Sequence, residues 1–193
     1  MSAAEMPCGW SGKLPCRGDF IEGGARLDLF DWFAGWASEG AAAVRAGGGA
    51  LADAFLTAPL VRFAAAPGVV GRPAALGVLG PGMDRAGRLY PFLIAAELAE
   101  AQASGPDLQA NAEWFDKAEA AFLDFLAPDF DAALIAERLA DLPSFRPVAD
   151  SPGDTGMVWC AGDAQAEAAA SVPDMTTVMG LPVAKAAFGG QVG

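Results

Sequence analysis

The strongest constraint on the fold is a pair of short apolar runs, residues 75–79 and 89–98, joined by a connection rich in Gly and Pro. A parallel pair of strands needs a crossover of about a dozen residues or more, usually a helix, and none fits here. The two runs are therefore predicted to form antiparallel strands, with residues 83–88 (Met-Asp-Arg-Ala-Gly-Arg) as a hairpin loop. A third apolar run, at residues 60–66, is predicted to be another strand of the series.

Helical patterns lie on both sides of these strands. Residues 25–45 carry apolar side chains at steps of three and four, which predicts a long helix, and a shorter helix is expected at 50–55. Residues 111–126 predict another helix, and Asp129 or Asp131 would cap a further one. The pattern predicts an α+β fold (layered α/β) with a largely antiparallel central sheet covered by helices.

The C-terminal part is expected to add two strands, at residues 156–160 and 175–180, joined by a connection rich in Ala and Glu. Residues 143–155 are rich in Pro, Ser, Asp and Gly and are expected to form a loop. With no internal repeat and no linker, residues 1–193 are expected to form a single domain whose ends, 1–7 and 187–193, are loose.

The charge distribution limits the possible partners. Residues 1–90 carry equal numbers of basic and acidic residues, so residues 91–193 carry the whole net charge of −12. Without a dense cationic surface, binding to nucleic acid or to an anionic membrane is not expected. The acidic half forms either a solvated surface or a docking face for a basic partner. The sequence also has no apolar run near the ~20 residues of a membrane span and no secretory signal at its start, so we expect no membrane insertion and a cytoplasmic location.

The residue types present leave little catalytic equipment. The chain has no histidine, which removes Ser-His-Asp and Cys-His arrangements and the commonest zinc ligand. Its three cysteines show no paired spacing, so reduced thiols are expected, without a metal or a cofactor. Gly12 and Lys13 do not end a phosphate-binding P-loop, because Pro7 replaces its first glycine and Leu14 its Ser or Thr.

A charged segment near the N-terminus is the most distinctive motif. Residues 9–21 place two aromatic residues, two basic residues and an acid among three glycines and a proline. Glycine and proline interrupt regular ladders, so the segment is predicted to form a shaped turn rather than the interior of an element.

Three blocks in order resemble the TagF family, whose members are accessory proteins of bacterial type VI secretion. The first is Gly-Trp-Ser-Gly-Lys-Leu-Pro-Cys-Arg-Gly-Asp-Phe at residues 9–20. The second is Phe-Leu-Thr-Ala-Pro at 55–59, followed by Arg-Phe at 62–63 and Pro-Gly-Val at 67–69. The third is Gly-Val-Leu at 77–79, followed by Asp-Arg, Gly-Arg and Pro-Phe pairs up to residue 92.

The resemblance implies regulation rather than catalysis. TagF-like proteins act as post-translational repressors and are thought to bind the cytoplasmic forkhead-associated scaffold protein of the secretion system, so that protein is the expected partner. The residues predicted to bind it are the charges carried by turns: Lys13, Arg17, Asp19, Asp84, Arg85 and Arg88.

Three other interpretations stay open at this stage. The same charges could hold the fold together internally, because an Asp beside an Arg in a tight turn often satisfies backbone N–H groups or forms an ion pair. A hydrolase could use Asp19 and Asp84 if both carboxylates lay in one pocket. A structural subunit of a larger complex would instead show a large apolar surface patch.

Overall fold

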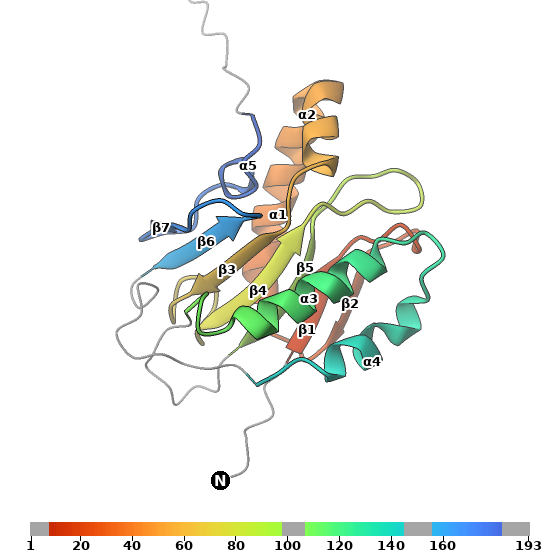
Figure 1. Cartoon of the computed structure of the whole chain (residues 1–193). Coiled ribbons are helices and arrows are strands. Elements are labelled where there is room, and N and C mark those ends of the chain that lie inside the picture. Colours follow the sequence, from red (N-terminus) through yellow and green to blue (C-terminus); the bar gives the residue numbers. More distant parts are fainter. Residues whose placement is uncertain (1–7, 98–106, 145–155, 183–193) are drawn as a thin grey trace, which may run out of the picture.

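The computed structural model describes residues 8–97, 107–144 and 156–182. Its centre is a seven-stranded antiparallel sheet. The strand order is β2-β1-β5-β4-β3-β6-β7 (Figure 1). Helices cover the sheet, so the predicted α+β class is confirmed. The strands are β1 (Cys8–Gly12), β2 (Ile21–Gly24), β3 (Val61–Ala65), β4 (Ala75–Gly80), β5 (Phe92–Glu97), β6 (Met157–Ala161) and β7 (Glu167–Ala169).

The predicted hairpin forms the centre of the sheet. β4 pairs antiparallel with β5, with Leu79 opposite Leu93, and an isolated bridge joins Met83 to Leu89 within the connection. The sequence predicted that this strand would begin at residue 89. It begins at Phe92 instead, because Pro91 has no N–H to donate to a ladder. The last residue of the predicted strand, residue 98, lies outside the described residues.

Helices lie on both faces of this sheet. The helices α1 (Leu29–Ala46), α2 (Gly48–Leu56) and α5 (Met175–Val178) pack on one face, and α3 (Ala112–Phe125) and α4 (Ile135–Ala140) pack on the other (Figure 1). Successive residues of a strand point to opposite faces. Leu79 of β4 therefore packs in the core between the sheet and α1, α2 and α5 (the first core), and Val78 packs in the core between the sheet and α3 and α4 (the second core). All six residues of β4 and all six of β5 are buried.

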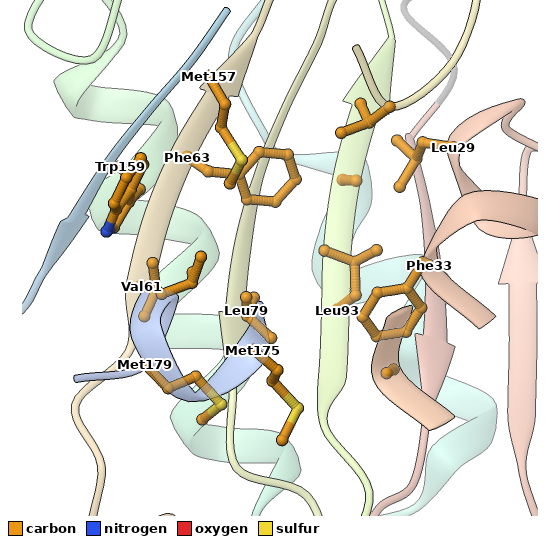
Figure 2. Packing of buried hydrophobic residues seen from close by; sticks show 14 of the residues in the cluster. Leu29, Phe33, Val61, Phe63, Leu79, Leu93, Met157, Trp159, Met175 and Met179 are labelled. Atoms are coloured by element: carbon orange, nitrogen blue, oxygen red, sulfur yellow. The ribbon is translucent and has the colours of Figure 1, made fainter. Parts of the chain in front are cut away.

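A short helix in the first core replaces one of the predicted strands. Residues 175–180 were expected to form a strand, but residues 175–178 form α5, and Figure 2 shows Met175 and Met179 packed over the strands that carry Val61 and Leu79. Asp174 caps this helix, because its Oδ1 accepts a hydrogen bond from the Thr177 N–H at 3.0 Å. Local capping thus outweighs the strand preference of the β-branched residues.

The charged segment near the N-terminus differs in part from its prediction. Its first residues form β1, inside the sheet between β2 and β5, and its last residue, Ile21, begins β2. Residues 13–20, between the two strands, form the predicted turn, but two of the segment's three glycines, Gly9 and Gly12, lie in β1 and permit close backbone approach there. A Cβ added at Gly9 would lie 2.5 Å from the Ala25 carbonyl oxygen, and one at Gly12, where φ is +135°, would lie 2.3 Å from the Pro91 carbonyl oxygen.

The remaining differences concern element ends and one short strand. The predicted helix at 25–45 begins at Leu29, because the chain is still leaving β2 at Ala25, whose N–H donates to the Cys8 carbonyl at 2.9 Å. β7 was expected to be part of a connection, since Glu and Ala are poor strand formers, and its pairing with β6 overrides that preference. Asp131, not Asp129, provides the predicted cap, for the turn Ala132–Leu134 that precedes α4.

The predictions for α2 and α3 are confirmed within one or two residues at each end. Among the described residues, no helix is both long enough and apolar enough to cross a membrane.

A buried carboxylate caps α1 from the far end of β5. Glu97 is 6% exposed, and its Oε1 accepts a hydrogen bond from the Leu29 N–H at 2.8 Å. Burial raises the pKa of Glu97, although hydrogen bonds from the N–H groups of Leu29 and Asp28 act in the opposite direction. The oxygen acceptor therefore stabilises the helix start, whereas the negative charge does not contribute net stability.

Replacement of Glu97 separates these two contributions. Glu97→Gln keeps the oxygen acceptor and removes the buried charge, so the free energy of unfolding at pH 7 is expected to stay the same or rise. Glu97→Ala removes the acceptor and is expected to cost about 1 kcal/mol. Urea unfolding of the two variants checks this, and equal destabilisation of both would show that the charge is needed.

Candidate functional site

Sheet pairing brings the two predicted charged segments together. β1 lies beside β5, with Ser11 opposite Leu93, so the chain leaving β1 runs next to the hairpin loop that leads into β5. The two backbones meet at Gly82, where an added Cβ would lie 2.5 Å from the Lys13 carbonyl oxygen. We call the six residues assembled there the charged cluster: Lys13, Arg17, Asp19, Asp84, Arg85 and Arg88.

Asp84 is the centre of the charged cluster. Its Oδ2 accepts from Lys13 Nζ and from Arg88 Nε, both at 2.7 Å, and its Oδ1 accepts from the N–H groups of Ala86 and Arg88, both at 3.0 Å. Its side chain is completely buried and that of Lys13 is 7% exposed. Burial alone would raise the pKa of Asp84, but the hydrogen bonds from Lys13 and Arg88 outweigh it and hold that pKa well below its usual range.

The arginines of the hairpin join it to the first segment. Arg88 Nη2 donates to the Gly18 carbonyl at 2.6 Å and lies 3.7 Å from an Asp19 carboxylate oxygen. The Arg85 N–H donates to the Arg17 carbonyl at 2.8 Å, and its guanidinium donates to the Cys16 carbonyl. These contacts fix the loop between β1 and β2 against the hairpin.

The six residues differ in their access to solvent. Lys13 and Asp84 are buried, so these two charges hold the fold together internally, which was one of the alternative interpretations. Arg17, Asp19, Arg85 and Arg88 are exposed on the same rim. Binding of a partner by the six remains a prediction, and in this fold only the four exposed residues could touch one directly.

An exposed aromatic residue that the prediction omitted belongs to the same place. Phe20 is 58% exposed, its ring packs edge-to-face on Tyr90 at 4.6 Å, and Lys13 Nζ lies 4.7 Å from its centroid. It also lines a surface groove of about 490 Å³ beside the cluster, together with Trp10, Ile21 and Ile135. The sequence signal that could have identified Phe20 is its position directly after Asp19 in a charged turn.

The geometry does not suit a carboxylate hydrolase. Asp84 has both oxygens occupied by donors and does not line the groove, whereas Asp19 lines it and is almost fully exposed. Burial raises the pKa of the Cys8 thiol to about 12, which keeps it protonated and unreactive at neutral pH. No group of three or more potential metal ligands occurs among the residues that the structure describes.

Comparisons with known proteins place the chain in a class. A family model described as the TagF N-terminal domain, type VI secretion system-associated, matches residues 9–142, a range that includes the whole charged cluster. The fold and sequence thus define a protein associated with type VI secretion. The chain belongs to the TagF family.

A solved structure supports the same assignment. The chain is similar to PA0076 from Pseudomonas aeruginosa PAO1, at 28% sequence identity and a TM-score of 0.71. The similarity covers 86% of this chain and 89% of that one, so it extends beyond the residues matched by the family model. None of the curated proteins matches the chain.

Proposed function

We propose that this protein is a cytoplasmic, post-translational repressor of type VI secretion that acts by binding the forkhead-associated scaffold protein of the system. Family membership supports the association with type VI secretion. The observation that favours binding is the rim of Arg17, Asp19, Arg85 and Arg88, which presents exposed charges on two adjoining loops that a buried ion pair joins. Such a rigid, charged edge suits recognition of another protein.

The proposed mechanism is occupancy and needs no chemical step. A repressor that binds one state of the scaffold withdraws that state from assembly by mass action. Two features support this over catalysis: the chain has no histidine, and Asp84 is fully engaged by Lys13 and Arg88. The structural-subunit alternative has less support, because the exposed large apolar residues of the described part lie on four different segments: Phe20, Leu56, Leu123 and Leu134.

Direct binding is tested with the purified full-length scaffold protein. We expect a complex at micromolar concentrations by gel filtration and calorimetry, and fewer fluorescent sheath assemblies in cells that overproduce this protein. If no complex forms, direct binding is wrong. If a complex forms but sheath assembly and secretion are unchanged, the protein binds the scaffold without repressing the system.

A further inference from the structure

The groove beside the charged cluster contains unpaired positive charge. Within the described part of the chain, Arg17, Arg45 and Arg85 are the cationic side chains that have no carboxylate within ion-pair distance. Arg45 lies in the last turn of α1, but Arg17 and Arg85 line the same groove. Two arginines without ion-pair partners in one groove contrast with a chain whose net charge is −12.

The two acidic residues of the groove form ion pairs with other arginines. Asp19 lies 3.7 Å from Arg88, and Glu22 lies 3.7 Å from Arg26. Both acids are thus associated with arginines that do not line the groove. Arg17 has no side-chain partner among the described residues, and Arg85 uses its guanidinium only for the Cys16 carbonyl.

The rest of the groove is apolar and aromatic. Phe20, at 58% exposed, lines it, and the other apolar lining residues are Trp10, Ile21, Ala132 and Ile135. Exposed aromatic residues next to arginines are typical of the residues that contribute most to protein–protein binding. The groove therefore combines apolar contact area with two positions that fit a carboxylate.

We propose that this groove binds an acidic peptide segment of a partner protein, with carboxylates on Arg17 and Arg85 and an adjacent apolar side chain against Phe20. The inference rests on the proposed function only for which protein carries the segment. A carboxylate fits better than a phosphate, because a phosphate brings close to two negative charges next to Asp19 and Glu22, whereas a carboxylate matches one guanidinium.

The probe for this proposal is a fluorescein-labelled peptide, Glu-Leu-Glu-Phe-Glu-Leu-Glu, titrated with the full chain by fluorescence anisotropy. The matched control peptide has Gln in place of each Glu. We expect the acidic peptide to bind about tenfold or more tightly than the Gln peptide at about 50 mM salt, and the difference to shrink as salt is raised. Equal affinity for the two peptides overturns the proposal.

Charge reversal locates the contact. Arg17→Glu and Arg85→Glu are each expected to weaken binding of the acidic peptide by about tenfold. Arg45→Glu makes the same charge change at an exposed arginine outside the groove and is expected to change the affinity less than about twofold. Arg17→Glu should leave the Tm close to that of the unmodified protein, whereas Arg85→Glu also loses the hydrogen bond to the Cys16 carbonyl, so its circular dichroism spectrum must show a folded protein at the temperature of the titration. Equal effects at all three positions would mean general charge attraction and would overturn the proposal.

Two further arms separate the alternatives. A further peptide carries one phosphothreonine in place of the central Glu-Phe. If it binds more tightly than the acidic peptide, the groove recognises a phosphorylated segment, and the proposal as stated is overturned. Calorimetry with the scaffold protein is read separately. If the scaffold fails to bind while the peptide results hold, the groove proposal stands and the proposed partner is wrong. If the scaffold binds the unmodified protein and all three variants with equal affinity, the proposed partner stands and the groove proposal is wrong.

Discussion

Replacement of Asp84 by Ala is expected to lower the free energy of unfolding at pH 7 by about 3–5 kcal/mol. The substitution leaves the buried ammonium of Lys13 without the carboxylate that it contacts at 2.7 Å. It also removes the acceptor for the backbone N–H groups of Ala86 and Arg88, which shape the hairpin turn. Urea unfolding followed by circular dichroism measures the change.

Lys13→Met is the matched comparison, because it removes the other partner of the same pair. Asp84 would keep hydrogen bonds from Arg88 Nε and from two backbone N–H groups, so its charge stays compensated. We expect a smaller loss, on the order of 1–2 kcal/mol. A greater loss for Lys13→Met than for Asp84→Ala would show that the ammonium, and not the carboxylate, organises the cluster.

The contribution of Asp84 should depend on pH in a defined direction. Its pKa is lower in the folded state than in the unfolded state, so its stabilising effect is complete above the unfolded value of about 4. The effect is lost as the pH falls toward the folded pKa. The difference in stability between the unmodified protein and Asp84→Ala should therefore narrow from pH 5 downward. A constant difference would mean that the carboxylate charge is not the source.

Phe122→Ala is expected to destabilise the protein by about 3–5 kcal/mol, which is a large part of the stability of an ordinary domain. Phe122 lies on α3, is fully buried, and packs edge-to-face on Phe92 of β5 at 5.5 Å. Its ring also covers Gly80, where an added Cβ would lie 2.8 Å from its Cζ. Because Gly80 has no side chain to move into the space, we expect the cavity to collapse poorly.

Leu123→Ala provides the control for this prediction. Leu123 is the next residue of the same helix and is 60% exposed, so its truncation should change the free energy of unfolding by less than about 0.5 kcal/mol. Urea unfolding of both variants gives the comparison. Similar losses at the two positions would mean that helix propensity, rather than packing against the sheet, dominates the stability of α3.

The antiparallel hairpin and the long helices could be predicted from local patterns. The connection before β5 is too short for a crossover, and the apolar spacing of α3 matches one helix face. The prediction for α5 failed because Thr and Val favour strands, and because the cap made by Asp174 acts over only four residues. The strand β7 was missed because pairing with β6, not its own composition, holds it in the sheet.

Within the candidate site, the sequence by itself determined which charges lie in turns and excluded histidine chemistry. It did not determine which of those charges are buried. Lys13 and Asp84 are 71 positions apart in the chain, and only the pairing of β1 with β5 places them in contact. That pairing encloses one ion pair and leaves Arg17 and Arg85 exposed along a groove, since burial depends on the strand arrangement and not on local sequence.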